Sequence, residues 1–184
     1  MSEIKFEWES GIEEVCSKLK DKKLIGIQLP DGLKVKSHTI TKKIKDLTGA
    51  NVILWGEPTY GACDLADRPL EEVGADALIH LGHLPMPYHS EFYAIPTYFV
   101  PVKHTGKLNL KNQSLEKIRK MLPKKIGIVT TAQHLHMIDE ATEKLENIGF
   151  DASVTKGGPR LAAAGQLLGC NYCLLYTSPS PRDR

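Results

Sequence analysis

The strongest constraint on the fold is an order of predicted strand, helix and glycine that occurs early in the chain and again later. Residues 23–30 form a short apolar run typical of a buried strand, and residues 33–47 carry apolar side chains at helical spacing up to Gly49. A second apolar run follows at residues 51–55. Strands that alternate with helices pair in parallel, because each helix returns the chain to the start of the next strand.

Residues 56–102 extend this pattern. After turn-forming residues at 56–61 we predict a short helix over residues 64–73, then strands over residues 76–81 and 96–102. The alternation of strands and helices predicts an α/β domain with a parallel sheet, which we assign to residues 1–105.

The second part of the chain repeats this order. A predicted strand at residues 125–130 precedes a predicted helix at 134–148, which ends at Gly149 just as the earlier helix ends at Gly49. Self-similarity of this kind indicates an internal duplication. We therefore expect tandem duplicated parallel-sheet domains, with residues 106–172 forming a second, incomplete α/β domain.

The last residues, 173–184, have a different character. They read CLLYTSPSPRDR, with Ser-Pro repeats and no helical or strand periodicity. They resemble translated adapter sequence, so we expect this tail, Cys173 included, to be non-native and the natural protein to continue differently after Tyr172. A natural disordered tail is the alternative that this composition also permits.

Charge and hydropathy exclude several classes of protein. The chain has 24 Lys and Arg against 22 Asp and Glu, a net charge of +2, which is too balanced for a dedicated nucleic-acid binder. No apolar run approaches the ~20 residues that span a bilayer, and the first residues lack the features of a signal peptide. We expect a cytoplasmic protein without direct nucleic-acid or membrane partners.

Two of the cysteines occupy corresponding places in the two halves. Cys63 and Cys170 each precede a residue that favours helix N-caps, Asp64 and Asn171. A helix that begins at Asp64 is expected to direct its dipole at Cys63 and favour the thiolate. Thiolates bind soft metals and iron–sulfur clusters. Because the two are far apart in sequence, a shared site has to form between domains. A small buried side chain is the alternative for each, and Cys16, at helical spacing, is expected in the core.

A further set of polar residues lies where the predicted strands end, at the edge where open α/β sheets bind ligands. Turn formation and packed histidines are the alternatives for these positions. The candidate cofactor-binding residues are Gln28, Asp31, Tyr60, Gly61, His80 and His83.

These residues belong to longer motifs that resemble a known family. The chain is similar, over residues 4–172, to the archaeal 3-amino-3-carboxypropyl transferase of diphthamide synthesis, a non-standard radical S-adenosylmethionine enzyme. The motifs that carry the resemblance are QLPDGL at 28–33, GEPTYGACDLAD at 56–67, HLGH at 80–83, AQH at 132–134 and GQLLGCN at 165–171.

The resemblance implies a fold of three similar α/β domains and a 4Fe-4S cluster held by one cysteine from each. Cys63 and Cys170 then correspond to the first two ligands, and the third ligand is absent from this chain. It also implies that one iron binds S-adenosylmethionine, and that a 3-amino-3-carboxypropyl radical is added to a histidine of translation elongation factor 2. An electron donor and a homodimer are implied too. Without the third domain we expect an inactive fragment that holds no stable cluster.

Two other functions compete with this one. The chain is alternatively a cluster-free scaffold or partner subunit of an active enzyme. A third hypothesis is a zinc-binding module that uses Cys63, His80, His83 and Cys170. No local spacing of ligands favours the zinc module.

Overall fold

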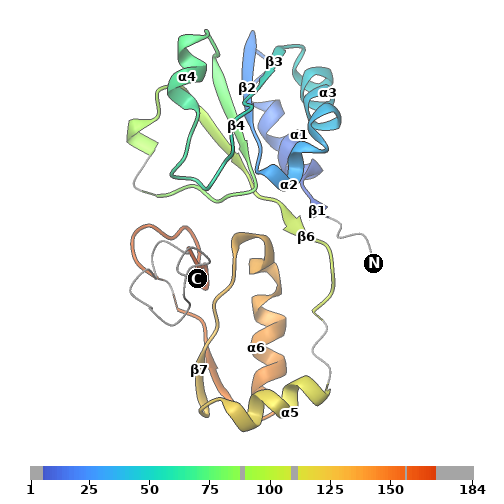
Figure 1. Ribbon diagram of the computed structural model, residues 1–184, viewed down its shortest axis with the longest axis vertical. Helices are drawn as coiled ribbons and strands as arrows, with labels where there is room; N and C mark the ends of the chain where they lie inside the picture. The colour runs from blue at the N-terminus through green and yellow to red at the C-terminus, as the bar shows by residue number, and fades with distance from the viewer. Residues whose placement is uncertain (1–5, 88–89, 109–111, 156, 169–184) are drawn as a thin grey trace, which may run out of the picture.

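A computed structural model of the chain describes residues 6–87, 90–108, 112–155 and 157–168. Cys170 and the predicted tail lie outside the described residues. The chain forms two units stacked along the long axis (Figure 1), an N-terminal unit of residues 6–104 and a C-terminal unit that begins at residue 112.

The N-terminal unit is built on a four-stranded sheet in the order β3-β2-β4-β5, with every pair parallel. A short antiparallel pair, β1 and β6, lies outside this sheet. The elements are β1 (Phe6–Glu7), α1 (Glu9–Ser17), β2 (Leu24–Gln28), α2 (Asp31–Lys34), α3 (Ser37–Thr48), β3 (Asn51–Leu54), α4 (Asp67–Glu72), β4 (Ala77–Leu81), the 3₁₀ turn η1 (Ser90–Phe92), β5 (Thr97–Val100) and β6 (Lys103–His104).

Helices cover both faces of this sheet. One face packs against α1 and α3 through a fully buried cluster that includes Ile12, Ile25 and Ile40, and the other packs against α4 through Leu70 and neighbours. Strand β4 is therefore buried along its whole length. The predicted strands at 23–30, 51–55 and 76–81 are confirmed as β2, β3 and β4. Burial on both faces produces the apolar runs of the two central strands, β2 and β4, whereas β3 is a half-buried edge strand.

The helix predicted over residues 33–47 is two helices, α2 and α3. The apolar spacing predicted one continuous helix because it counted Val35 as a buried position. Val35 is 87% exposed and does not pack against the sheet. The predicted end is confirmed: Gly49 follows α3 with a φ of 74°, a left-handed conformation that glycine adopts without strain.

The strand predicted over residues 96–102 is confirmed as β5, which is shorter than predicted. It ends at Val100, because Pro101 has no N–H to donate to a neighbouring strand. Strand β6 follows beyond the predicted range. Strand β6 leaves the sheet and pairs with β1 instead.

The C-terminal unit contains a two-stranded parallel sheet, β7-β8. Its β7, α6 and β8 follow one another in the order of β2, α3 and β3, although the helix predicted over 134–148 begins as a 3₁₀ turn. The elements are α5 (Asn112–Met121), β7 (Lys125–Gly127), the 3₁₀ turn η2 (Ala132–Met137), α6 (Ile138–Glu146) and β8 (Asp151–Ser153).

The carboxyl edge of the larger sheet faces the C-terminal unit (Figure 1). The amide Nε2 of Gln133, in η2, donates to the carbonyl of Gly82 at 2.8 Å. The rings of His104 and His134 also meet across this boundary, with centroids 5.1 Å apart. Within the described part of the chain, no helix is long and apolar enough to cross a membrane.

Candidate functional site

The candidate site is built around the segment that joins β3 to α4, residues 55–66, which we call the Cys63 loop. Cys63 is a free, exposed cysteine on this loop. The loop leaves the carboxyl edge of β3 and is held to the sheet at both ends by side chains from β2 and α2.

The start of the Cys63 loop is held by Lys34. Its ammonium donates to the carbonyls of Gly56 and Glu57, each at 3.0 Å, and lies 2.7 Å from a carboxylate oxygen of Asp31. Asp31 pairs with Lys34 and is mostly exposed, and its predicted role in binding a cofactor stays a prediction. Lys34 is not among the predicted site residues, because its two carbonyl partners in the loop are more than twenty positions away.

The end of the Cys63 loop is held by Gln28, the last residue of β2. Its Nε2 donates to the carbonyl of Asp64 at 2.7 Å, and its Oε1 accepts from the backbone N–H of Ala66 at 3.2 Å. The side chain is 1% exposed. Gln28 is therefore buried and supports the end of the loop through both atoms of its amide group.

His80 continues this network from β4. Its Nδ1 lies 2.9 Å from Oε1 of Gln28, and its Nε2 lies 2.8 Å from Nδ1 of His83. The two backbone partners of Gln28 establish that Oε1 is an acceptor, so His80 must donate from Nδ1. A neutral His80 then accepts at Nε2, and His83 must donate from its own Nδ1.

Burial keeps both rings neutral. His80 is fully buried, and its pKa is lowered to about 3. The main cause is desolvation, and the neighbouring His83 adds a smaller effect. Desolvation lowers the pKa of His83 as well. Hydrogen bonds thus run from His83 to His80 to Gln28, and they leave Nε2 of His83 as an unprotonated acceptor.

Gly82 shapes the turn that presents His83. Its φ is 90°, and a Cβ atom there would lie 2.9 Å from Cγ of Pro30, so only glycine fits. Its N–H donates to the carbonyl of Val100 at 2.9 Å and its carbonyl accepts from Gln133. The turn after β4 is therefore anchored on both units.

The other predicted site residues lie on the Cys63 loop itself. Tyr60 is 85% exposed, and its N–H donates to the carboxylate of Asp64 at 3.0 Å. The predicted helix N-cap at Asp64 is wrong, because α4 begins at Asp67 with Ala66 as its N-cap. The Asp64 carboxylate accepts a hydrogen bond within the loop and does not cap a helix. No helix that begins at Asp64 therefore directs its dipole at Cys63. Gly61 lies in the same turn, and a Cβ atom there would be 3.7 Å from Sγ of Cys63.

Cys63 is the one described cysteine suited to bind a metal or cluster. Cys16 is 1% exposed, as predicted for a core residue, and burial raises the pKa of its thiol to about 11. Cys170 lies outside the described residues. Among the residues that the structure describes, no three His, Cys, Asp or Glu side chains form a metal-binding group. The zinc hypothesis also loses His80, since both of its ring nitrogens are hydrogen-bonded.

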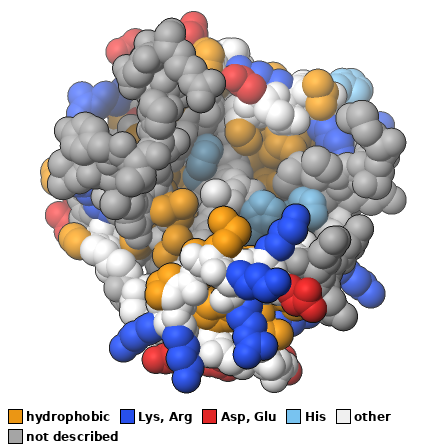
Figure 2. All heavy atoms as spheres, turned by 60° about the horizontal axis from the view of Figure 1, so that its bottom comes forward, with side chains coloured by type: hydrophobic (Ala, Val, Ile, Leu, Met, Phe, Trp, Pro, Cys, Tyr) orange, Lys and Arg blue, Asp and Glu red, His pale blue; other side chains and the backbone are white. Residues whose placement is uncertain are grey.

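A cavity of about 200 Å³ lies at the boundary between the units, at the carboxyl edge of the large sheet, between Pro30, Gly82 and Gln133. Figure 2 shows the face of the molecule on which the C-terminal unit comes forward. Histidine side chains lie around the middle of that face, and lysine and arginine side chains lie over its lower half.

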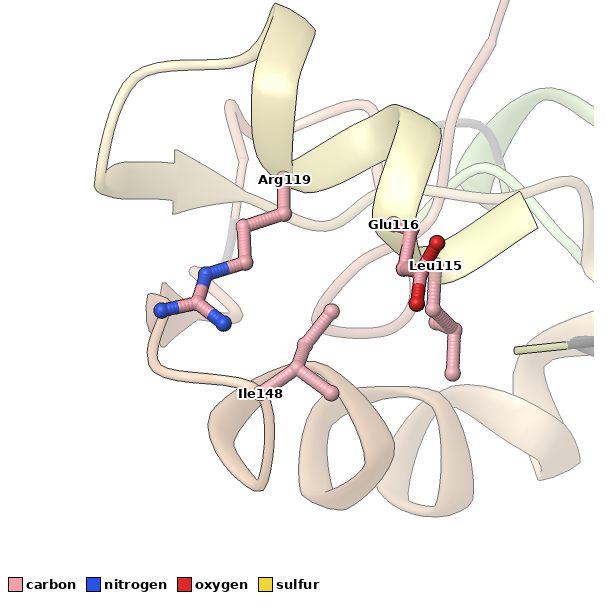
Figure 3. Close-up of a pocket in the computed structure, with 4 residues that line it drawn as sticks. All are labelled: Leu115, Glu116, Arg119 and Ile148. Carbon is pink, nitrogen blue, oxygen red and sulfur yellow. The ribbon is translucent and has the colours of Figure 1, made fainter. Parts of the chain in front are cut away.

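A second cavity, of about 260 Å³, lies in the C-terminal unit. Leu115, Glu116 and Arg119 extend into it from α5 towards Ile148, which follows α6 (Figure 3). It is formed by elements of the C-terminal unit alone and does not include the Cys63 loop.

The fold and the Cys63 loop define a parallel α/β protein with an exposed thiol at the carboxyl edge of its sheet. The sequence model of a family described as "Putative diphthamide synthesis protein" matches residues 29–183. The chain belongs to this family.

Curated relatives support the same assignment. The 2-(3-amino-3-carboxypropyl)histidine synthase of Pyrococcus horikoshii is 42% identical over 160 residues, which cover 84% of this chain and 45% of that protein. Subunit 1 of the same synthase from Bos taurus is 30% identical over 154 residues, 80% of this chain and 33% of that protein. The chain thus spans less than half the length of these relatives.

Solved structures match the fold. The crystal structure of Dph2 from Pyrococcus horikoshii superposes with a TM-score of 0.76 at 38% identity and covers 86% of this chain and 46% of that one. The structure described as containing a 4Fe-4S cluster gives a TM-score of 0.75 at 38% identity, over 90% of this chain and 48% of that one. The parallel α/β architecture is therefore that of Dph2.

Proposed function

We propose that this chain is part of an enzyme that transfers the 3-amino-3-carboxypropyl group of S-adenosylmethionine to a histidine of translation elongation factor 2. The observation that carries the proposal is the exposed thiol of Cys63 on a loop held at both ends. The names of the relatives and the cluster of the Pyrococcus structure support it.

In this proposal Cys63 is one ligand of a 4Fe-4S cluster, and Cys170 is a second. When bound, the cluster supplies the electron that cleaves S-adenosylmethionine. The chain's own residues position the thiol: Lys34 and Gln28 hold the two ends of the loop, and Asp64 holds Tyr60 within it. A thiol held in this way reaches a cluster without ordering a loose loop on binding.

We also propose that this chain is part of a longer protein with a repeated domain. The relatives are about twice as long as this chain, and β7, α6 and β8 have the order of β2, α3 and β3. We propose two domains of a duplicated set of three, with a third cysteine supplied by the missing domain, and a homodimer with an external electron donor. The 184-residue chain alone then lacks a ligand and is inactive. Sequencing the locus across codons 169–184 tests this, and a stop directly after Arg184 would contradict it.

The activity is tested with cluster-loaded full-length protein under anaerobic conditions. Dithionite, S-adenosylmethionine and elongation factor 2 are added, and the target histidine is examined by mass spectrometry. A mass gain of one 3-amino-3-carboxypropyl group is expected, with methylthioadenosine as by-product. An unmodified histidine in the presence of a reducible cluster would refute the proposal.

Cysteine variants test the ligand assignment separately. Cys63→Ser should lose bound iron and the absorbance of the cluster, while Cys16→Ser, in the core, should keep both. Equal iron content in the two variants would remove Cys63 from the ligand set.

A further inference from the structure

His83 is the open end of the hydrogen-bonded chain behind the Cys63 loop. Its Nδ1 is taken up by His80, and its Nε2 makes no hydrogen bond within the described part of the molecule. The buried side-chain polar atoms without partners there are Thr59 Oγ1 and the Tyr93 hydroxyl, so Nε2 of the half-buried His83 is open to solvent.

The position of His83 places this nitrogen at the candidate site. The turn that carries His83 lies at the carboxyl edge of the sheet, and Gly82 is held there by Val100 and Gln133. The same network that holds His83 also holds the end of the Cys63 loop, through Gln28. One hydrogen-bonded network therefore holds both the His83 ring and the end of the Cys63 loop.

We propose that Nε2 of His83 accepts a hydrogen bond from the α-ammonium group of S-adenosylmethionine. This inference rests on the proposed function, since it assigns a residue to a substrate of that reaction. It makes His83 a binding residue, and it makes His80 and Gln28 positioning residues that set its tautomer.

The hydrogen-bonding groups of S-adenosylmethionine favour its α-ammonium as the partner of His83. An unprotonated imidazole nitrogen only accepts, so the substrate carboxylate, also an acceptor, is excluded as its partner. The donors of S-adenosylmethionine are the ammonium, the adenine amino group and the ribose hydroxyls, and hydrogen bonds from charged donors are the strongest. The lowered pKa of His83 fits a ligand with a net positive charge, because an imidazolium would repel it.

Two substitutions separate binding from support. In His83→Asn, the side-chain NH₂ occupies the place of Nδ1 and still donates to His80, but the Nε2 acceptor is gone. In His83→Gln, the amide oxygen reaches the place of Nε2, but the donor to His80 is gone. If His83 binds the substrate, His83→Asn should weaken binding of S-adenosylmethionine more than His83→Gln does. If His83 only supports the structure, His83→Gln should weaken it more.

The measurement is equilibrium binding of S-adenosylmethionine to cluster-loaded full-length protein by anaerobic calorimetry. Methylthioadenosine, which lacks the amino acid part, is titrated in parallel. His83→Asn should weaken S-adenosylmethionine about tenfold or more and change methylthioadenosine less than about twofold, while His83→Gln keeps most of the affinity. Iron content and thermal midpoint are recorded to show that each variant is folded and loaded.

Equal S-adenosylmethionine affinity for wild type and His83→Asn would overturn the inference and leave the proposed function standing. Parallel losses for both ligands, or a larger loss in His83→Gln than in His83→Asn, would overturn it as well. Failure of loaded wild-type protein to bind S-adenosylmethionine would overturn the proposed function and the inference together.

Discussion

The side chain of Gln28 bonds the backbone of the Cys63 loop on both sides of Leu65: its Nε2 donates to the carbonyl of Asp64 and its Oε1 accepts from Ala66. A single buried amide at the end of β2 therefore ties the loop to the sheet. This contact joins positions 36 and 38 residues apart in sequence, so it forms only when β2 and the loop are both in place.

Gln28→Met should destabilise the protein, because it keeps the volume but removes both hydrogen-bonding groups. It leaves the Asp64 carbonyl, the Ala66 N–H and Nδ1 of His80 without partners, and one such buried group costs about 1–3 kcal/mol. We expect a loss of about 2–4 kcal/mol in urea unfolding. Asn51→Met, at an exposed position, is the control and should stay within about 0.5 kcal/mol. A Gln28→Met protein as stable as this control would show that the network contributes nothing.

Lys34→Met should loosen the start of the Cys63 loop with little global effect. The ammonium of Lys34 is partly exposed, so its ion pair with Asp31 adds little to stability. Its two carbonyl partners lose their donor, and amides of residues 58–64 should exchange hydrogen faster. Lys36→Met, two residues on and exposed, should leave this exchange unchanged. Identical exchange in the two variants would contradict the bracing role of Lys34.

Stability should fall in mild acid because His80 is buried in its neutral form. Its pKa is about 3 when folded and about 6.5 when unfolded, so below pH 6.5 the unfolded state binds the extra proton. The stability is complete above that pH and declines by up to about 1.4 kcal/mol per pH unit as the pH falls. Urea unfolding from pH 7.5 to 4.5 measures this slope.

Two histidine variants identify the source of that slope. His80→Asn should reduce the slope and leave the contribution of His83, whose pKa burial also lowers, whereas His38→Asn, on the exposed side of α3, should leave the slope unchanged. A wild-type slope of zero over this window would mean that His80 is protonated in the folded protein.

Thiol labelling should distinguish the two described cysteines. Cys63 is exposed and should react with iodoacetamide at pH 8 in the native protein. Cys16 is buried, and its pKa of about 11 leaves almost no thiolate at that pH, so it should react only after denaturation. Peptide mass spectrometry gives the extent at each position, and native labelling of Cys16 would contradict the packing of α1.

Sequence patterns predict the sheet of the N-terminal unit because burial on both faces leaves a readable signal. The apolar runs of β2 and β4 and the end of α3 at Gly49 are of this kind. Patterns fail where an apolar residue does not pack, as at Val35, or where proline divides a run, as at Pro101.

The sequence identifies the site residues more easily than their roles. Motif spacing draws attention to His80 and His83, and Cys63 stands out by its repeat. The role of Gln28 depends on partners from a loop and from β4, the latter 52 residues away, and no local pattern records such a contact. Gln28 and His80 therefore have supporting contacts that the sequence does not reveal, and Lys34 was not among the predicted residues.

The pairing of β1 with β6 has a practical consequence for handling the protein. Phe6 lies opposite His104, so β1 lies beside the strand that leads into the connection between the two units (Figure 1). A fluorophore attached to a residue of β1 would therefore report on bending of that connection, and a bulky group attached there would hinder it.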